Sequence, residues 1–451
     1  MKKISRRSFL QITAAGAAAA ALSACGAASS AAASAASASA PASSAAAASA
    51  SPTGTITVLS FSEYHDAIQA SIDAYMKAYP DVTVKLEEYP YSQYNDAVSI
   101  KLGSGDSGFD VVLTDATMVS NYAYKGWIAP VDEYFTDDDK SQFAEALVKS
   151  GTYDGSFYSA PLCNSCQVLW YNKALLDKAG IEYPSEDPTQ RLSWEKVVEL
   201  GQSVIAAAKD SSVFGLTFEQ VDRPYQILPL PNSMGADAFS ADGKTVDGYL
   251  NSDNFQKAMQ WYSDIHNVSC IAPKGTSPSD SVGLFTAGKI AFMCANIFDF
   301  GTFSKTDGLQ FGFTAFPYFT DGKPASPTDS WHVSLSSFSK NVGTAVDFIK
   351  YFTMGDGNDT FLTTKGAFAA RTKVLESYST DSAYSEFPKT VFKLAAYEAQ
   401  NTAYPRPITL AYGEFETIID STFSDIRNGS DVAEALNSAV SQMQTQMSMY
   451  D

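Results

Sequence analysis

The chain has 451 residues, of which 45% are hydrophobic and 13% aromatic, so it is long enough for two or more domains with sizeable apolar cores. Lysine and arginine total 31, aspartate and glutamate total 50, and the formal net charge is −19. Such a surface repels nucleic acid and gives no long-range attraction to anionic substrates. We therefore expect no nucleic-acid partner, and the charge is typical of a soluble secreted protein.

Residues 1–24 have the pattern of a targeting segment, with basic residues before an Ala- and Leu-rich run. Ser5-Arg-Arg-Ser-Phe-Leu10 resembles a twin-arginine export signal, and a general secretory signal remains the alternative. Leu22-Ser-Ala-Cys25 resembles a lipobox, in which the signal is cut before Cys25 and a lipid is attached to the sulfur. We expect a protein outside the cytoplasm, anchored to the cell membrane by that lipid, with an uncut anchor as the alternative. The Ala- and Ser-rich residues 25–53 are expected to form a flexible tether.

The folded part is expected to begin near Gly54 with alternating strands and helices. The β-branched and apolar runs predict strands at 55–60, 82–86 and 109–113, and periodic apolar residues predict helices at 64–79 and 93–102. The third strand is continuously apolar, as in a sheet that is covered on both faces. This βαβαβ order predicts a doubly wound α/β lobe.

The stretch Tyr158–Gly180 predicts a crossover from this lobe into another. Val168-Leu-Trp-Tyr171 is an apolar run that predicts a buried strand. A short helix over Lys173–Lys178 should follow, with Asn172 as its N-cap and Gly180 just beyond its end.

Motifs in this stretch resemble those of the carbohydrate-type extracellular solute-binding proteins of ABC importers. They are Asp154-Gly-Ser-Phe-Tyr158-Ser-Ala-Pro161 and Tyr171-Asn-Lys-Ala-Leu-Leu-Asp-Lys-Ala-Gly-Ile181. Phe285-Thr-Ala-Gly-Lys-Ile-Ala-Phe292 and the segment Gly126–Tyr134 are similar to patterns of the same family, so the resemblance covers residues 54–449.

The resemblance implies an α/β, two-lobed fold of the periplasmic-binding-protein type II. Each lobe would be a mostly parallel sheet flanked by helices, and crossover segments would form the hinge. The expected lobes are residues 54–163 with 314–378, and residues 164–313 with 379–451, with a second crossover at Phe311–Pro317. A monomeric, non-enzymatic protein without a cofactor would capture a sugar or oligosaccharide by lobe closure and deliver it to the permease of an ABC importer.

Two other motifs are explained by local structure. Gly103-Ser-Gly-Asp-Ser-Gly108 matches a dinucleotide-binding pattern, but it follows a predicted helix and precedes a strand, so a turn is expected. Cys163 and Cys166 form a C-x-x-C motif ahead of a strand, which favours a structural role over a redox one. Whether this pair, or Cys270 with Cys294, forms a disulfide is left open. No metal-site motif is evident.

Candidate ligand contacts are the polar and aromatic residues near predicted strand ends, because ligands bind there in open α/β sheets. A sugar needs aromatic faces for its C–H groups and hydrogen-bonding partners for its hydroxyls. By resemblance, Glu63 and Asp115 match polar ligand contacts of the family, and Phe298 falls where relatives often have a stacking Trp. The full candidate set is Glu63, Tyr64, Thr114, Asp115, Asn164, Arg223, Asn296, Phe298, Asp299, Trp331, His332, Arg371 and Tyr412.

Three alternative functions are compatible with these residues. The same fold could bind a non-sugar polar solute, although the lack of an evident basic cluster disfavours a multiply anionic one. A secreted carbohydrate-active enzyme would use two carboxylates such as Glu63 and Asp115. A thiol–disulfide lipoprotein would use Cys163 and Cys166.

Overall fold

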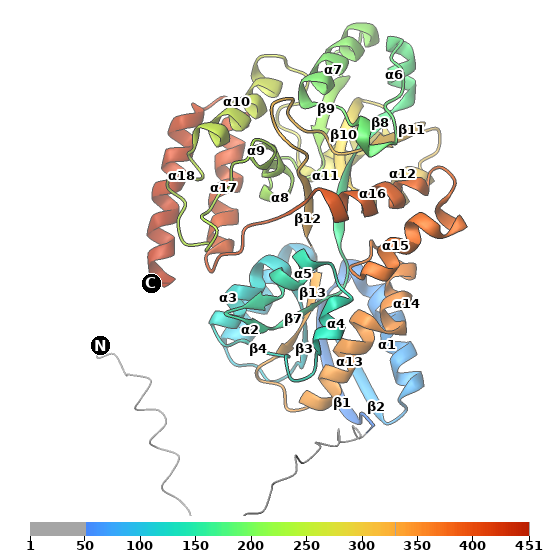
Figure 1. The fold of residues 1–451 in the computed structure, drawn as a ribbon, viewed down its shortest axis with the longest axis vertical. Coiled ribbons are helices and arrows are strands. Elements are labelled where there is room, and N and C mark those ends of the chain that lie inside the picture. The colour runs from blue at the N-terminus through green and yellow to red at the C-terminus, as the bar shows by residue number, and fades with distance from the viewer. Residues whose placement is uncertain (1–50, 330, 451) are drawn as a thin grey trace, which may run out of the picture. The chain divides into compact units, whose positions relative to one another are not determined.

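The computed structural model describes residues 51–329 and 331–450. The expected signal segment, Cys25 and residues 25–50 of the expected tether lie outside the described residues. Figure 1 shows the described chain as two groups of helices, each arranged around its own sheet. Among the described helices, none is both long enough and apolar enough to span a membrane.

The first sheet contains the βαβαβ unit that the sequence predicts. Its strands lie in the order β2 (Val82–Tyr89), β1 (Gly54–Phe61), β3 (Val111–Asp115), β13 (Trp331–Ser336) and β4 (Ile128–Ala129), and β7 (Ser159–Pro161) pairs with β13. The helices around it in Figure 1 are α1 (His65–Ala78), α2 (Tyr91–Gly103), α3 (Val119–Tyr124), α4 (Asp137–Ser141), α5 (Glu145–Ser150), α13 (Val342–Met354) and α14 (Asp356–Lys365). A short hairpin joins β5 (Thr152–Tyr153) and β6 (Ser156–Phe157).

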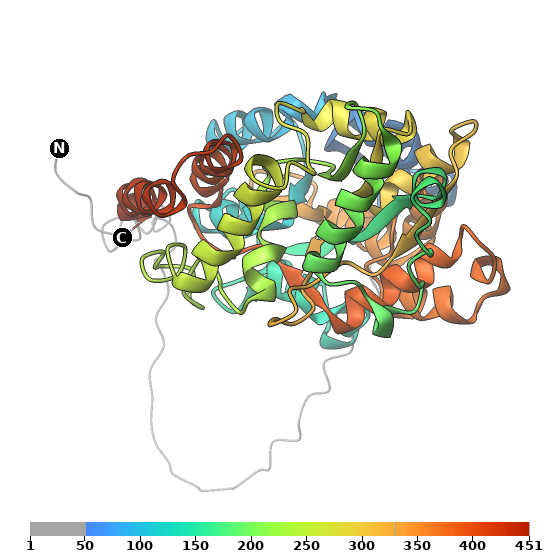
Figure 2. The same cartoon turned by 90° about the horizontal axis from the view of Figure 1, so that it is seen from above.

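The second sheet has strands in the order β14 (Ala403–Pro405), β12 (Ser326–Asp329), β8 (Ser165–Asn172), β10 (Ile290–Asn296) and β9 (Phe214–Phe218), and β11 (Phe311–Thr314) pairs with β8. Its group includes α6 (Lys173–Ala179), α7 (Trp194–Ala208), α8 (Pro224–Ile227), α9 (Pro229–Ser233), α10 (Asp253–Asn267), α11 (Pro278–Thr286), α12 (Phe300–Lys305) and α16 (Thr390–Asn401), with α15 (Thr372–Thr380) packed on α16. Figure 2 shows the last two helices, α17 (Tyr412–Arg427) and α18 (Val432–Met447), side by side at one edge.

Local signals at the start of the second group behave as predicted. The Asn172 side chain accepts a hydrogen bond from the backbone N–H of Leu175 at 3.1 Å, which caps α6. Gly180 ends that helix with φ of 68°, a left-handed conformation that favours glycine. The prediction for this crossover strand and its helix is therefore confirmed in detail.

Both sheets are mixed, which corrects the expectation of mostly parallel sheets. In the first sheet β1 is parallel to β2 and β3, whereas β13 is antiparallel to β3, β4 and β7. In the second sheet β8 is antiparallel to β10, β11 and β12. The strands that break the parallel order, β13 and β8, are those by which the chain enters each sheet from the other one.

Two of the three crossings between the groups lie beside each other at the junction of the sheets. The chain leaves the first sheet after β7 and enters the second at β8, through Leu162–Asn164. It returns between Asp329 in β12 and Trp331 in β13. The crossover expected at Phe311–Pro317 is wrong, because β11 runs along β8 in the second sheet. A Cβ on Gly312 would lie 2.2 Å from the Tyr171 ring, so this glycine lets β11 pair closely there.

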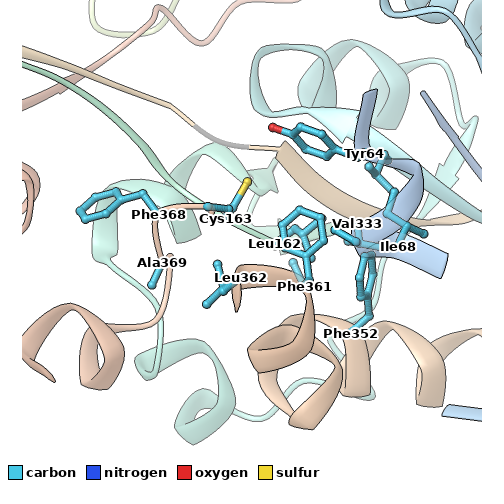
Figure 3. Close-up of a cluster of buried hydrophobic side chains, with 14 of the residues drawn as sticks. Tyr64, Ile68, Leu162, Cys163, Val333, Phe352, Phe361, Leu362, Phe368 and Ala369 are labelled. Carbon is cyan, nitrogen blue, oxygen red and sulfur yellow. The ribbon is translucent and has the colours of Figure 1, made fainter. Parts of the chain in front are cut away.

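A cluster of buried apolar side chains holds the first crossing in place. Figure 3 shows Leu162 and Cys163, from the crossing, among Val333 of β13, Phe361 of α14 and Ile68 of α1. Each is at most 1% exposed. Apolar burial of this kind is a principal favourable contribution to folding, so the crossing has a fixed end in the core of the first group.

Candidate ligand-binding site

A pocket of about 200 Å³ lies where strand ends from the two sheets meet. It receives residues from the ends of β1, β3 and β10, the loop after β9 and the start of β13. Its aromatic lining residues are Phe61, Tyr64, Tyr91, Tyr225, Phe298 and Trp331. Its other lining residues are Glu63, Asp115, Cys163, Asn164, Ser165, Gln220, Arg223, Asn296, Asp329 and Arg406. A concave site with several aromatic faces and convergent polar groups is typical of a small-molecule site.

The aromatic side of the pocket is a packed group centred on Phe61. The Phe61 ring lies 4.5 Å from Trp331 and 4.4 Å from Tyr64, measured between centroids. Tyr91 approaches both Phe61 and Trp331 edge-on. Behind them the buried Tyr94 hydroxyl donates to the carbonyl of Leu113 at 2.6 Å. Rings held this way present a preformed apolar surface to a ligand.

Arg406 is the central charged residue of the pocket. Its Nη2 donates to Asp115 Oδ1 at 2.7 Å, and its Nε donates to the carboxylate of Asp329. Nη1 donates to the Tyr412 hydroxyl at 3.2 Å. Burial alone would lower the pKa of Arg406, but the two carboxylates raise it well above its usual value, so the guanidinium stays charged. Because Asp115 ends β3 and Asp329 ends β12, Arg406 connects the two sheets.

A polar network forms the opposite wall. Ser165 Oγ donates to the carbonyl of Asp329 at 2.8 Å and lies 2.7 Å from the Tyr225 hydroxyl. Asn296 Nδ2 also donates to Tyr225, at 3.3 Å, and Glu219 accepts from the Asn296 backbone N–H at 2.8 Å. These contacts fix the orientation of hydroxyl and amide groups that face the pocket.

The structure brings eight of the candidate residues together at the pocket. They are Glu63, Tyr64, Asp115, Asn164, Arg223, Asn296, Phe298 and Trp331. Both oxygens of Glu63 lie 3.1 Å from the backbone N–H of Tyr91, so this acid also holds the start of α2. Arg223 Nη2 donates to Glu416 Oε1 at 2.9 Å, so Arg223 is paired at the pocket edge.

Five candidate residues do not line the pocket. Thr114 is buried, and its Oγ1 lies 2.8 Å from Ser334 Oγ. Arg371 donates to Asn358 at 3.1 Å and to the carbonyl of Met354 at 2.8 Å. The pleat of β3 keeps Thr114 out of the pocket, because successive side chains of a strand point to opposite faces and the Asp115 side chain faces the pocket.

The other three lie close to lining residues without lining the pocket themselves. Tyr412 is fully buried and meets the pocket only through Arg406. Burial, and then the neighbouring Glu219 carboxylate, raises the pKa of Asp299 to about 8, so this pair is expected to hold one proton at neutral pH. His332 is fully buried, and its Nδ1 lies 3.1 Å from the carbonyl oxygen of Ser159.

Sequence reasoning missed several lining residues. Tyr91 follows the end of β2 and so carried the same strand-end signal as the chosen candidates. Gln220 follows β9 in the same way. Asp329 ends β12, which was not among the predicted strands. Arg406 gave no local signal, because it reaches Asp115 across 291 positions of sequence.

The buried histidines predict a pH dependence of stability. Burial lowers the pKa of His332 and of His266 to about 4, from about 6.5. Below pH 6.5 the unfolded chain therefore binds more protons than the folded one, and the free energy of unfolding should fall as the pH decreases from about 6.5 to about 4. Each histidine contributes on the order of 3 kcal/mol.

Urea unfolding between pH 4 and 7 measures this effect. His332→Gln and His266→Gln should each flatten the decline over that range. His65→Gln is the matched control, because His65 is exposed and a hydrogen bond to Glu88 raises its pKa. An unchanged pH slope in both buried-site variants would contradict the expectation.

All four cysteines among the described residues are free thiols. Cys163 lines the pocket, and burial raises its pKa to about 12. Burial likewise raises the pKa of Cys166. A thiol–disulfide exchange site needs a thiolate, and both positions oppose its formation. Among the described residues there is also no group of three or more His, Cys, Asp or Glu side chains that could hold a metal ion.

Two α/β groups with a pocket between their strand ends define the class of two-lobed solute-binding proteins. A family model described as bacterial extracellular solute-binding protein matches residues 61–354, more than half of the chain. The chain therefore belongs to the bacterial extracellular solute-binding protein family, as the sequence motifs suggest, and this family consists of binding proteins rather than enzymes. A model of twin-arginine translocation signal sequences matches residues 3–23, which together with the family indicates a location outside the cytoplasm.

Curated relatives are distant. A putative binding protein of Brucella abortus (strain 2308) is 22% identical over 241 residues, which is 53% of this chain and 56% of that protein, so this match spans little more than half the relative's length. The galactooligosaccharide-binding protein of Bacillus subtilis is 25% identical over 402 residues, 85% of this chain and 87% of that protein.

Solved structures confirm the two-lobed α/β fold. The GacH receptor of Streptomyces glaucescens, solved unliganded and with acarbose, has a TM-score of 0.75 and 22% identity and covers 88% of this chain and 100% of its own. An ABC substrate-binding protein of Listeria monocytogenes in complex with cycloalternan has a TM-score of 0.76 and 21% identity, covering 88% of this chain and 99% of its own.

Proposed function

We propose that this protein captures a sugar or oligosaccharide in the pocket between its lobes and delivers it to the permease of an ABC importer. The observation that carries the proposal is the pairing of a packed aromatic surface, around Trp331 and Phe61, with hydroxyl, amide and carboxylate groups on the facing walls. A pyranose has an apolar C–H face and a rim of hydroxyls, and each side of the pocket matches one of these. The Bacillus subtilis relative bears the name galactooligosaccharide-binding protein, which agrees with this chemistry.

Capture would proceed by closure of the lobes about the two crossings that follow β7 and β12. We place the first lobe at residues 54–163 with 331–371, and the second at residues 164–329 with 372–450, following the sheets to which the strands belong and the packing of α15 on α16. Both crossings pass beside the pocket, so a small change of backbone angles there would move one wall toward the other. The closed, monomeric form would be the one presented to the permease.

A thermal-shift screen tests the proposal on the mature protein. The screen contains mono- and oligosaccharides, polyols, amino acids and polyamines. A sugar that binds only the folded state should raise the melting temperature by several degrees at about 100 times its dissociation constant. The ligand should be recovered intact afterwards. A response only to non-sugar solutes would discard the sugar assignment.

The membrane anchor is a separate part of the proposal and rests on the lipobox-like sequence Leu22-Ser-Ala-Cys25. A thioether-linked lipid on Cys25 would hold the protein at the membrane while residues 26–53 act as the tether. Cells labelled with palmitate should incorporate label into the wild-type protein and not into Cys25→Ser. Lipidation would be contradicted if the wild-type protein and Cys25→Ser associated equally with the membrane and neither incorporated label.

A further inference from the structure

Two carboxyl groups lie together beside the polar wall of the ligand-binding pocket. Glu219 directly follows β9, and Asp299 belongs to the helical turn Ile297–Asp299 that follows β10. The two side chains are within hydrogen-bonding reach of each other. Neither residue lines the pocket, but each is close in sequence to a residue that does, Gln220 in one case and Phe298 in the other. The pair therefore connects two segments of the pocket wall.

Glu219 fixes the arrangement of both segments through hydrogen bonds. Its Oε2 accepts from the backbone N–H of Asn296 at 2.8 Å and from Gln226 Nε2 at 3.2 Å. Gln226 Oε1 in turn accepts from the backbone N–H of Gln220 at 2.9 Å. The Asn296 side chain accepts from the backbone N–H of Phe298 at 3.0 Å. Three lining residues, Asn296, Phe298 and Gln220, thus depend on the position of one carboxylate.

Asp299 fits beside this carboxylate only if the pair holds a proton. Its Oδ2 is buried, although the residue as a whole is partly exposed, and no donor among the described residues reaches this oxygen. Two neighbouring carboxylates repel each other, and the loss of water around them strengthens the repulsion. A proton bound by the pair turns Asp299 into a donor to Glu219 and leaves one negative charge in place of two.

Several charged and titratable groups surround the pair. Burial raises the pKa of Glu219, and the Arg223 guanidinium opposes this shift. The Tyr225 phenol of α8 interacts with Glu219, and burial keeps the phenol neutral by raising its pKa. The elements packed on the helical turn of Asp299 are β8, α12 and α16, whose titratable residues are Cys166, Tyr171, Lys305, Lys393, Tyr397 and Glu398. The pKa of Asp299 responds to burial and then to Glu219, and to none of these six.

We propose that Asp299 and Glu219 are positioning residues that share one proton, and that this proton holds Asn296, Phe298 and Gln220 in their binding arrangement. The inference rests on the proposed sugar-binding function and adds a pH dependence to it. Loss of the proton at alkaline pH places two buried charges side by side and separates the two segments of the wall. Ligand affinity therefore falls as the pH rises, although the pair does not touch the ligand.

Calorimetric titration between pH 7 and pH 9.5 tests the inference with a neutral sugar that responds in the thermal-shift screen. A neutral sugar does not titrate in this range, so any change comes from the protein. Burial, and then Glu219, raises the pKa of Asp299 to about 8, so about 3% of wild-type molecules hold the proton at pH 9.5. The apparent dissociation constant should rise by about 10- to 30-fold, because apparent affinity falls with the binding-competent fraction.

Asp299→Asn should remove this pH dependence, because its amide donates to Glu219 at every pH. Glu219→Gln is a second variant with the same expected result, since only one acid remains in the pair. Asp307→Asn is the matched control, because Asp307 is an exposed acid just beyond α12, and it should keep the wild-type profile. Burial, and then Glu416, raises the pKa of Asp420 to about 7, but Asp420 does not act on Asp299, so its contribution persists in every variant.

Infrared spectroscopy over the same pH series detects the shared proton directly. Wild-type protein should lose a C=O band of a protonated carboxyl group between pH 7 and pH 9.5, and Asp299→Asn should lack that band. A wild-type dissociation constant that stays within about twofold, or an equal slope in Asp299→Asn, would overturn the inference and leave sugar binding intact. Absence of the band from the wild-type protein would overturn it as well. Failure of every sugar to bind would instead overturn the proposed function, and the band would still establish the shared proton.

Discussion

Arg406→Gln is expected to lower the free energy of unfolding by about 3–5 kcal/mol. The substitution leaves Asp115 and Asp329 without their cation, and their side chains are only 13% and 6% exposed. An ion pair of this kind is not by itself a large source of stability, but removing one partner exposes the full cost of the buried charges that remain. Glutamine retains hydrogen-bonding capacity, so the lost charge dominates the effect.

Urea unfolding followed by tryptophan fluorescence measures this loss. Lys289→Gln is the matched control. The side chains of Lys289 and Asp210 are 36% and 46% exposed, so their ion pair should contribute less than about 1 kcal/mol to the free energy of unfolding. Asp115→Asn and Asp329→Asn, added to Arg406→Gln, should restore most of the stability by removing the two carboxylate charges that Arg406 neutralises. A loss no larger than that of the control would show that water reaches these carboxylates.

Local sequence patterns were sufficient for the elements that place the pocket. The apolar spacing of Ile68, Ile72 and Tyr75 predicted α1, and all three are fully buried. Asn172 and Gly180 marked both ends of α6. Such capping residues act on the first or last turn of their own helix, so the ends of these helices can be predicted from the local sequence alone.

Sheet order and crossing points depend on contacts that are distant in sequence. Phe311-Gly-Phe-Thr314 has the same apolar character whether it crosses between sheets or pairs with β8, and only the fit of Gly312 to the Tyr171 ring distinguishes the two. The pocket shows the same limit. Strand ends predicted Asp115 and Asn296, whereas Arg406 comes from the irregular segment after β14 and acquires its role only when the two sheets meet.

Trp331→Ala is expected to weaken sugar binding by about 2–3 kcal/mol, which corresponds to roughly 30- to 150-fold in dissociation constant. Trp331 is held against Phe61, with its ring also near Tyr91 and Tyr94 at 6.1 and 5.9 Å. In β13 it is the register partner of Asp115 in β3, so an aromatic face and a carboxylate stand beside each other. A sugar ring placed there would stack and donate a hydroxyl hydrogen bond at the same time.

Calorimetric titration of the responding sugar distinguishes stacking from general packing. Trp331→Phe keeps a ring and should lose at most about tenfold in affinity, because the apolar surface shrinks but persists. Trp261→Phe is the control for a tryptophan away from the pocket, since Trp261 packs on Trp194 in the second group. A dissociation constant for Trp331→Ala within threefold of wild type, with an unchanged melting temperature, would mean that the ligand is held by the polar walls. The rings around Phe61 would then serve the core of the first lobe alone, and a solute without an apolar face would become the better candidate.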